Sequence, residues 1–259
     1  MAPINSISTI ANGLSYEELL IMIRSFDLWN KADIYVFCDK EVGDKLSTIM
    51  LERCPIHVLP SMPEHLSKAN RRNSFGSLLR CKMDAVEPAI REKGNTLFVD
   101  ADIIFLSKVN GIDLDKYDVA VSPHGIKKAD ELKWGFYNAG YIAIRNPEFP
   151  KWWREACNTS KYVDQECLTR APDHFNCQML GFEHNFGWWR ILQAPSNDEK
   201  KRRITSFHVN ENIICYENNP LISAHLHLRL AKSNILHSLL KGLLSRSSDP
   251  RHKTVLGWF

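Results

Sequence analysis

Short apolar segments alternate with helical segments through the first hundred residues of the chain. The apolar segments that we predict to be strands are 4–11, 34–38, 56–59 and 96–106. The predicted helices begin at the Ser15-x-x-Glu18 capping box and at about residues 40 and 74, and end near residues 26, 52 and 92. Continuous apolar strands separated by helices are typical of a parallel sheet buried on both faces. The sequence therefore predicts an α/β fold with a Rossmann-like, mostly parallel central sheet and helices on both faces.

The second half of the chain has a less regular pattern. The strands that we expect there are 119–122, 140–145, 204–209 and 221–228. A helix is expected to begin at Trp152-Trp153, and residues 170–200 are rich in loop-forming and aromatic residues. These segments extend the same α/β unit without strict alternation.

Two carboxylates, Asp100 and Asp102, interrupt the apolar segment 96–106. In an extended strand residues i and i+2 point to one face, so the two side chains converge on one spot. Asp-x-Asp most often lies in a solvated turn, but here apolar residues flank it on both sides. Buried carboxylates require a cation or an exposed position at the end of the strand. Their oxygens suit Mg²⁺ or Mn²⁺, and parallel sheets bind ligands beyond the carboxyl ends of their strands.

Several short motifs occur in one order along most of the chain. They are Arg80-Cys-Lys-Met-Asp84, Phe98-Val-Asp-Ala-Asp102, Phe136-Tyr-Asn-Ala-Gly-Tyr-Ile-Ala-Ile144, Asp164-Gln165, Asn185-Phe186 and His225-Leu-His227. In this order they resemble the nucleotide-sugar glycosyltransferases of the A-type fold, particularly the glycogenin-like and bacterial galactosyltransferase-like group. The Asp-x-Asp followed by Asn-Ala-Gly is the most specific part of the resemblance.

The resemblance implies a manganese or magnesium site at the Asp-x-Asp motif. Asp102 would bind the metal directly, Asp100 would be shared with the ribose of the donor, and Ala101 between them would contact the nucleotide. A late histidine completes such metal sites, and His225 fits that role first and His227 second. The alternative for each histidine is a hydrogen-bonded or solvent-facing side chain.

This sequence departs from the family pattern after the late histidine. The usual Gly-x-x-Lys-Pro-Trp is replaced by Leu228-Arg-Leu-Ala-Lys232. Arg229 or Lys232 would then be the residue that reaches the donor phosphates.

The resemblance also implies a nucleoside site at the start of the sheet. Thr9, Ala11 and Asn12 would contact the nucleoside, and Asp39 would bond the base or simply end its strand as a turn residue. Arg80 and Lys82 lie two residues apart and so do not share a helix face. We expect one of them to reach the phosphate or the sugar and the other to be solvated, while Asp84 pairs with Arg80.

Three residues are implied near the reacting carbon of the sugar. Asn138 would contact the donor sugar, and Asp164 and Gln165 would bond its hydroxyls. The structural alternatives are a turn for Asn138 and an N-cap of segment 165–170 for Asp164. The family implies retention of configuration, although Asp164 is also a possible general base for inversion. Trp188 and Trp189 would stack on an acceptor sugar or pack in the core.

These expectations amount to a metal-dependent glycosyltransferase that moves a sugar from a UDP-sugar to a glycan, glycoconjugate or other hydroxyl acceptor. A non-catalytic nucleotide-sugar-binding protein on the same fold is the first alternative. A haloacid-dehalogenase-like phosphatase also uses Asp-x-Asp after a strand. That family has Asp-x-Asp-Gly-Thr near the N-terminus, whereas Ile103 and Ile104 follow the motif here.

The cysteine content and the lack of long apolar segments indicate the cellular compartment that we expect for the protein. The seven cysteines are scattered without a CxxC pair, which indicates neither a disulfide framework nor a zinc site. No apolar run approaches the roughly 20 residues of a membrane span, and the first residues lack a signal-peptide pattern. We therefore expect a cytoplasmic protein.

The C-terminal part of the chain is basic. From Lys200 onward ten Lys and Arg face three Asp and Glu, which leaves seven positive charges. We expect residues 1–229 to form the transferase domain and residues 230–259 a basic amphipathic tail. Segment 232–246 has an apolar face that would pack in the core or lie on a membrane surface. No nucleic-acid-binding pattern supports a nucleic acid partner.

Overall fold

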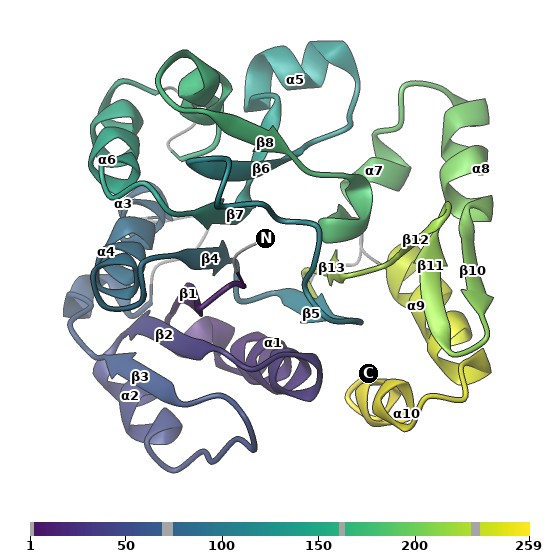
Figure 1. Ribbon diagram of the computed structural model, residues 1–259, viewed down its shortest axis with the longest axis horizontal. Coiled ribbons are helices and arrows are strands. Elements are labelled where there is room, and N and C mark those ends of the chain that lie inside the picture. The colour runs from purple at the N-terminus through teal and green to yellow at the C-terminus, as the bar shows by residue number, and fades with distance from the viewer. Residues whose placement is uncertain (1–2, 69–74, 161–163, 229–233) are drawn as a thin grey trace.

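A seven-stranded central sheet organises the molecule, with strand order β3-β2-β1-β4-β7-β6-β8 (Figure 1). The computed structural model describes residues 3–68, 75–160, 164–228 and 234–259. The sheet strands are β1 (Ser6–Ala11), β2 (Asp33–Cys38), β3 (Ile56–Leu59), β4 (Thr96–Val99), β6 (Val119–Pro123), β7 (Tyr137–Ile144) and β8 (Cys177–Met179). Strands β3, β2, β1 and β4 are mutually parallel, whereas β7 runs antiparallel to both β4 and β6. The predicted fold class, a mostly parallel α/β sheet, is confirmed.

Helices cover both faces of this sheet (Figure 1). The α-helices are α1 (Tyr16–Trp29), α2 (Lys40–Leu46), α3 (Phe75–Arg80), α4 (Lys82–Lys93), α5 (Lys128–Trp134), α6 (Phe149–Thr159), α7 (Trp189–Leu192), α8 (Asn197–Thr205), α9 (Asn234–Arg246) and α10 (Pro250–Leu256). Short 3₁₀ helices are η1 (Gly13–Ser15), η2 (Glu64–Leu66), η3 (Glu166–Asp173) and η4 (Phe182–His184). Helix α1 packs Met22 and Phe26 into the core on one face, and α4 and α6 pack Val86 and Trp153 into the core on the other.

Two small sheets extend the fold beyond the central sheet. One has the order β5-β13-β9, with β5 (Ile103–Phe105), β13 (Ser223–His225) and β9 (Phe186–Gly187). The other consists of β10 (Phe207–Asn210), β11 (Ile213–Tyr216) and β12 (Asn219–Pro220). Strand β13 pairs antiparallel with β5, and His225 lies opposite Ile103. This pairing carries the late histidines to the Asp-x-Asp motif.

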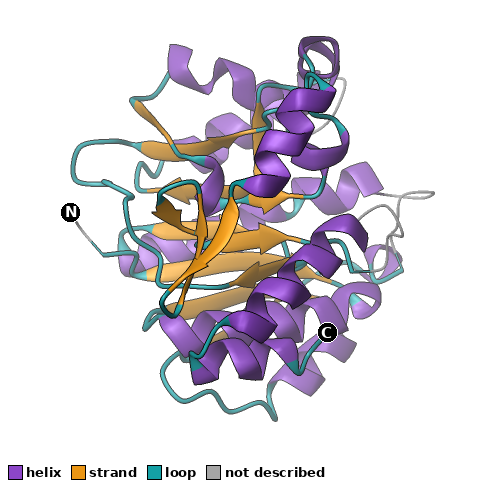
Figure 2. Cartoon of the chain, turned by 90° about the vertical axis from the view of Figure 1, so that its right-hand side faces the viewer, coloured by secondary structure: helices purple, strands orange, loops and turns teal. Residues whose placement is uncertain are grey.

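The C-terminal helices pack on a third apolar core. Leu236, Leu240, Leu243 and Leu244 of α9 are fully buried, together with Val255 of α10. In Figure 1 these helices lie on the right-hand side of the molecule. Figure 2 views the molecule from that side and shows helices lying across the strands. The apolar face predicted in segment 232–246 is therefore used in core packing.

Two sequence predictions at the C-terminus lie outside the described residues. The predicted boundary between residues 229 and 230 falls in the undescribed segment 229–233, as do Arg229 and Lys232. Among the helices in the described part of the chain, none has the length and apolar composition needed to traverse a bilayer. All seven cysteines are free thiols, and only Cys177 is not buried.

Several predicted boundaries were wrong for local reasons. The predicted strand 96–106 is two strands, because a turn in which the Ile103 N–H bonds to the Asp100 carbonyl separates β4 from β5. Helix α2 ends at Leu46, since the Ser47 hydroxyl bonds back to a carbonyl of the helix. The predicted helix 74–92 is divided at Cys81 into α3 and α4.

The predicted capping box is displaced by one turn. Ser15 makes no side-chain capping bond to α1, and the box instead joins Asn12 and Ser15 around η1. Helix α8 and strand β11 were not predicted, because their polar or short sequences lack a clear apolar period.

Candidate active site

The predicted site residues meet at one edge of the central sheet. Asp100 and Asp102 follow β4, and the N–H of Asp100 bonds to the carbonyl of Gly140 near the start of β7. Because β7 is antiparallel to β4 and β6, its beginning and the end of β6 lie at the same edge as the carboxyl end of β4. The adjoining β13 supplies His225 to this edge, and His227 follows two residues later.

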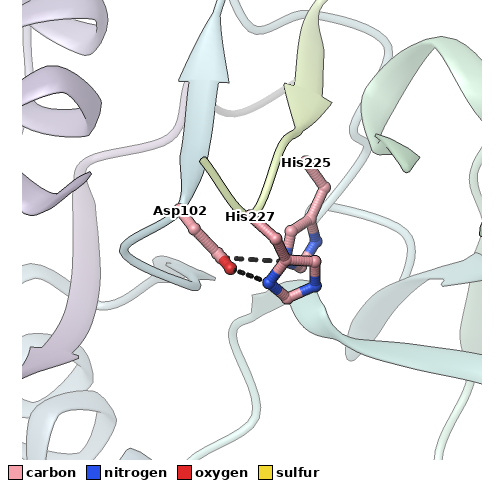
Figure 3. Close-up of side chains that lie close together, drawn as sticks. All are labelled: Asp102, His225 and His227. Carbon is pink, nitrogen blue, oxygen red and sulfur yellow. Dashed lines mark ion pairs between the residues drawn. The ribbon is translucent and has the colours of Figure 1, made fainter. Parts of the chain in front are cut away.

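Asp102, His225 and His227 form a compact cluster (Figure 3). His225 Nε2 lies 2.8 Å from Asp102 Oδ1, and His227 Nδ1 pairs with Asp102 Oδ2. One donor atom from each residue lies within 4.8 Å of the others. Burial raises the pKa of Asp102, but the charges and hydrogen bonds of His225 and His227 outweigh it, so the pKa is well below its usual value. Asp102 is therefore an ionised carboxylate facing two imidazoles.

A chain of amides orients the ring of His225. The Gly140 backbone N–H donates to Asn138 Oδ1 at 2.9 Å, and Asn185 Nδ2 donates to the same oxygen at 3.0 Å. Asn185 Oδ1 then faces His225 Nδ1 at 3.3 Å, so that nitrogen must carry the proton. Nε2, the other ring nitrogen, faces Asp102.

The cluster has the chemistry of a cation site. His225 is 2% exposed, and its Nε2 has no hydrogen-bond partner of good geometry in the described part of the chain. A buried imidazole nitrogen beside an ionised carboxylate and a second imidazole matches the ligands of divalent transition metals. Hydrogen bonding of the other ring nitrogen is also the usual support of a metal-bound histidine. The residues present therefore fit a divalent metal ion.

Gly140 makes room for this convergence. A Cβ at residue 140 would lie 2.6 Å from Asp100 Oδ2, 2.6 Å from His225 Cε1 and 3.0 Å from Asn138 Oδ1. These separations are shorter than van der Waals contact. Only a residue without a side chain allows the three groups to approach one another here.

Lys82 links the two predicted carboxylate positions. Its Nζ lies 2.9 Å from Asp100 Oδ1 and 2.7 Å from Asp164 Oδ2, and it also donates to the Ala139 carbonyl at 3.1 Å. Lys82 is only 1% exposed, and burial alone lowers its pKa, but the charges of Asp100 and Asp164 raise that pKa above its usual value. The prediction that Arg80 or Lys82 is solvated does not hold for Lys82, which is a buried cation shared by two carboxylates.

Asp164 is held from two sides. Its carboxylate binds Lys82, and its backbone carbonyl accepts a bond of 2.8 Å from Trp153 Nε1 of α6. Burial raises the pKa of Asp164 and the Lys82 charge opposes this, with a net increase. The alternative of an N-cap is wrong, since Gln165 occupies that position of η3.

Asn138 and Gln165 contact each other beside the cluster. Asn138 Nδ2 donates to Gln165 Oε1 at 3.2 Å and lies 3.3 Å from His124 Nε2. Asn138 lies inside β7 at an irregularity opposite Ser122, so the turn alternative is wrong. Burial lowers the pKa of His124 to about 4, so the ring is neutral at neutral pH.

Trp189 forms one wall of the cluster. Its ring stands edge-on to His225, with centroids 4.9 Å apart, and its Nε1 donates to the His124 carbonyl at 3.2 Å. Trp189 is 6% exposed, which favours packing over stacking on an acceptor. Trp188 is half-buried, and its ring centroid lies 6.1 Å from that of His227.

Arg190 anchors the segment that carries Asn185. Its Nε donates to the Asn185 carbonyl at 3.1 Å, and its NH2 group donates to Ser122 Oγ at 3.0 Å. The guanidinium is fully buried, and burial followed by the charge of Arg203 lowers its pKa to about 9. Arg190 thus ties α7 to the end of β6.

Of the residues predicted to contact the nucleoside, Asp39 lines a cavity, whereas Thr9, Ala11 and Asn12 are not among the described residues that line it. A cavity of about 610 Å³ lies beyond the carboxyl ends of β1, β2 and β3, and Gly13, Leu14, Asp39, Met62 and Lys68 are among its lining residues. Asp39 accepts the N–H groups of Val42 and Gly13, both at 2.9 Å, and so follows β2 as the N-cap of α2 and not as a turn residue, while it still faces the cavity.

Thr9, Ala11 and Asn12 lie at the end of β1 but are buried. Thr9 is 0% exposed, Ala11 2% and Asn12 2%, and Asn12 caps η1. Their position brings them near the neighbouring β4, which ends in the Asp-x-Asp motif.

Arg80 and Asp84 have different environments. The Asp84 carboxylate pairs with Arg154 at 2.9 Å. Arg80 ends α3 and is half-buried, and its Nε has no hydrogen-bond partner among the residues that the structure describes.

Sequence reasoning missed the roles of Asn185, His124 and Gly140. Asn185 and Gly140 fall in the motifs 185–186 and 136–144 that carried the resemblance, which was the available signal. His124 directly follows a strand that ends at this edge, but a lone histidine in a sequence gives no signal of its partners.

Comparison with known proteins extends these observations. No protein-family model matches the chain, and a search of curated protein sequences finds no relative. Among solved structures, the glycosyltransferase GlyE of Streptococcus pneumoniae TIGR4 superimposes with a TM-score of 0.60 at 13% identity, covering 99% of this chain and 63% of GlyE. The galactosyltransferase LgtC, solved with donor and acceptor sugar analogues, gives 0.59 at 13% identity over 96% of this chain and 99% of LgtC.

The apo form of GlyE gives a similar result, with a TM-score of 0.57 at 13% identity. The chain thus spans less than two thirds of GlyE and nearly all of LgtC. At this level of identity the likeness shows the fold. The chain has the mixed α/β fold of the A-type glycosyltransferases.

Proposed function

We propose that this protein is a metal-dependent glycosyltransferase that transfers a hexose from a UDP-sugar to a hydroxyl of a glycan or glycoconjugate. The observation that carries the proposal is the cluster of Asp102, His225 and His227 at the end of β4, beside Asp100, Lys82 and Asp164. The edge of an α/β sheet beyond its carboxyl ends is where such folds bind ligands.

The residues near the metal have separate roles in the proposal. Asp102 and His225 hold the cation, which would neutralise the negative charge that develops on the departing diphosphate. Asp100 binds the donor ribose while Lys82 holds its other oxygen. The proposed metal is Mn²⁺ or Mg²⁺.

The cavity beyond β1, β2 and β3 supports binding of the nucleoside. It lies at the same edge as the cluster, because β1 runs parallel to its neighbour β4. Asp39 lines the cavity and still has carboxylate lone pairs for a base N–H. In this proposal Thr9, Ala11, Asn12 and Ala101 contact the nucleotide, as the resemblance implies. Arg80, with its unpartnered Nε, is the proposed contact to phosphate or sugar.

The amide pair beside the cluster supports binding of the sugar. Asn138 and Gln165 would bond sugar hydroxyls, and Asp164 would stabilise positive charge on the ring. Asp164 is 4% exposed and bound to Lys82, which makes it a poor base for an incoming hydroxyl. We therefore propose retention of configuration, with the departing phosphate accepting the proton.

The first experiment is thermal unfolding with a panel of nucleoside diphosphates, with and without Mn²⁺. At about 100 times the dissociation constant, a bound ligand adds roughly 2.7 kcal/mol, or about 5–10 °C for a chain of this size. A metal-dependent shift with UDP is expected. No shift with any nucleotide would contradict a donor site.

Turnover separates an enzyme from the non-catalytic alternative. Release of UDP from a panel of UDP-hexoses is expected with the wild-type protein and not with Asp102→Asn. Proton NMR of the anomeric position in the product would test retention. Nucleotide binding without turnover on any donor would favour the non-catalytic alternative. The solved structures described above are glycosyltransferases, which favours the transferase proposal over the phosphatase alternative.

A further inference from the structure

We propose that Trp134 and Phe136, in segment 134–136 between α5 and β7, form an aromatic surface on which a pyranose ring of the acceptor saccharide stacks. The inference rests on the proposed function for the role of the bound saccharide. It adds a binding surface, the residues that form it and the class of ligand that it takes.

Segment 134–136 lies at the same edge of the central sheet as the candidate active site. Strand β6 ends at Pro123 opposite Tyr137, the first residue of β7, and α5 lies between these two strands in the chain (Figure 1). The segment therefore comes directly before Asn138, which is one of the residues of the candidate site.

Gln165 connects this segment to the candidate site. Its Nε2 donates to the Trp134 carbonyl at 3.0 Å, and its Oε1 accepts from Asn138 Nδ2 at 3.2 Å. One side-chain amide thus separates the Trp134 backbone from the amide that would bond the donor sugar. A saccharide bound on the segment would lie beside that donor sugar.

Hydrogen bonds also hold the rest of the segment. His124 Nδ1 donates to the Gly135 carbonyl at 2.8 Å, and the His124 N–H donates to the Phe136 carbonyl at 2.7 Å. The Phe136 N–H donates to Thr169 Oγ1 at 3.0 Å. A surface whose backbone is already fixed loses little conformational freedom when a ligand binds.

Gly135 allows the segment to pack against the backbone that carries Gln165. Its φ angle is +95°, which residues with a side chain rarely adopt. A Cβ at this position would lie 2.8 Å from the Gln165 carbonyl oxygen and 2.9 Å from the Glu166 Cα. The segment and residues 165–166 are therefore closely packed together.

The two aromatic side chains of the segment are exposed although its backbone is fixed. Trp134 is 37% exposed and Phe136 is 36% exposed. The Phe136 ring stands edge-on to the buried Tyr137 ring, with centroids 4.9 Å apart. Neighbouring exposed apolar side chains beside a candidate site are typical of a surface that binds a ligand. Trp189, which the sequence suggested for stacking, is 6% exposed.

The chemistry of this surface is complementary to a saccharide. A pyranose has a face of C–H groups, which packs on an aromatic ring, and hydroxyls at its rim, which require hydrogen-bonding partners. Lys133 Nζ lies 4.5 Å from the Trp134 ring centroid, so an ammonium group stands beside the aromatic surface. Aromatic rings bordered by a polar group match both parts of the sugar.

The composition of α5 argues against a lipid surface as the ligand. Leu132 is 79% exposed, but it is the one large aliphatic residue of the seven-residue helix. Four of the seven residues are charged, namely Lys128, Asp130, Glu131 and Lys133. A helix that lies in a membrane interface has a continuous apolar face, which this sequence does not provide.

The test follows the Trp134 indole in the full chain labelled with fluorotryptophan, by fluorine NMR. The probes are methyl glycosides of the common hexoses and N-acetylhexosamines, each added with and without UDP and Mn²⁺. Trp134→Phe and Trp258→Phe assign the two resonances that are compared. At least one glycoside is expected to shift the Trp134 resonance saturably and to leave unchanged that of Trp258, a half-buried residue after α10.

Three variants separate the aromatic ring from other effects. Trp134→Ala is expected to weaken glycoside binding by about tenfold in ligand-observed saturation-transfer NMR, the scale of losing one stacked ring. Trp134→Phe keeps an aromatic ring and is expected to retain most of the affinity. Leu132→Ala removes an exposed apolar side chain of the same helix and is expected to leave binding unchanged. Equal losses in Trp134→Ala and Leu132→Ala would contradict stacking on the ring.

The outcomes distinguish this inference from the proposed function. UDP release from UDP-hexoses, with no glycoside shifting the Trp134 resonance under any condition, would overturn the inference and leave the glycosyltransferase proposal standing. Glycoside binding at Trp134 without any effect of nucleotides on thermal unfolding would support the saccharide surface and contradict the donor site. A shift caused by phosphatidylcholine vesicles and by no glycoside would overturn the inference in favour of a lipid surface.

Discussion

At the scale of single residues, the candidate site depends on contacts that each restrict the orientation of one side chain. The Gly140 N–H orients Asn138, Asn138 orients Asn185, and Asn185 accepts the Nδ1 proton of His225. Lys82 keeps Asp100 and Asp164 together although both lie in a largely buried environment. The chemistry of the site is therefore set by neighbours as much as by the residues that would touch a ligand.

Asp102→Asn is expected to abolish sugar transfer while preserving the fold. The substitution keeps the shape of the side chain and removes the charge that faces His225 and His227. A loss of at least about a hundredfold in kcat/KM is expected, the scale of losing one charge-stabilising group. Steady-state kinetics beside far-UV circular dichroism would check it, and retained activity would overturn the site assignment.

Gly140→Ala is expected to disrupt the cluster from within. The added methyl group would lie 2.6 Å from both Asp100 Oδ2 and His225 Cε1, so the groups must separate. Overpacking of this kind costs about 1–3 kcal/mol, and metal affinity should fall with it. Denaturant unfolding and Co²⁺ titration would measure both.

Gly242→Ala is the matched control for that substitution. Gly242 lies in α9, and apart from its chain neighbours and the backbone of its own helix no described atom lies within 4 Å of the position that the added methyl group would occupy, so no clash arises. Alanine in a helix interior is favoured over glycine by roughly 0.5–1 kcal/mol. Equal effects of the two substitutions would show that the methyl group at residue 140 meets no obstacle.

Single residues differ in how far the sequence predicts them. The types and order of Asp100, Asp102, Asn138 and His225 indicated a site, because each stands at the end or start of an apolar strand. The burial of Lys82 was not predicted, since helical spacing from Arg80 says nothing about which carboxylates lie opposite. Contacts between side chains distant in sequence are set by tertiary packing.

At the scale of elements, the short β13 has more effect on the site than any long element. It pairs with β5 on one side and with β9 on the other. The first pairing brings the histidines to Asp102, and the second brings the segment after Asn185 beside them. The apolar stretch 221–228 predicted a strand, but its partner was not predictable because strand pairing leaves no mark in a single sequence.

Helix α9 gives a prediction at the element scale. Leu240 is 0% exposed in the third core, and Leu240→Ala is expected to lower the free energy of unfolding by about 2–5 kcal/mol. Leu239→Ala, at the half-buried neighbour, is expected to cost clearly less. Urea unfolding would compare them. A negligible cost at Leu240 would instead favour a membrane-facing helix, which liposome flotation of the full chain would then test.

At the scale of the whole molecule, the alternation of apolar strands and helices was sufficient to predict the fold class. It was not sufficient to predict that β7 is antiparallel. A strand that is buried on both faces has the same apolar sequence pattern whether it is parallel or antiparallel to its neighbours. That reversal places Asn138 and Gly140 beside the Asp-x-Asp motif. The sequence thus indicated which residues belong to the candidate site. It did not indicate the strand topology that brings them together.

Buried neutral histidines predict the pH dependence of stability. Burial lowers the pKa of His184 to about 4, so the native state stays neutral there while the unfolded state takes up a proton below about pH 6.5. The unfolded state then binds more protons, and the free energy of unfolding falls as the pH decreases from about 6.5 to 4. In this range His184→Gln is expected to make the slope shallower by up to about 1.4 kcal/mol per pH unit. Urea unfolding at several pH values would check this, and an unchanged slope would contradict it.

The bond between the Leu226 N–H and the Asp102 carbonyl has a consequence for the order of folding. It joins Asp102 and Leu226, which are separated by nearly half of the chain, whereas β1, β2 and β3 pair with strands that are near in sequence. Closing so long a loop is entropically costly and slow, so the short-range strands are expected to form first. The cluster of Asp102, His225 and His227 would then arise only in the last stage of refolding. A metal-sensitive signal during refolding would therefore lag behind the recovery of secondary structure.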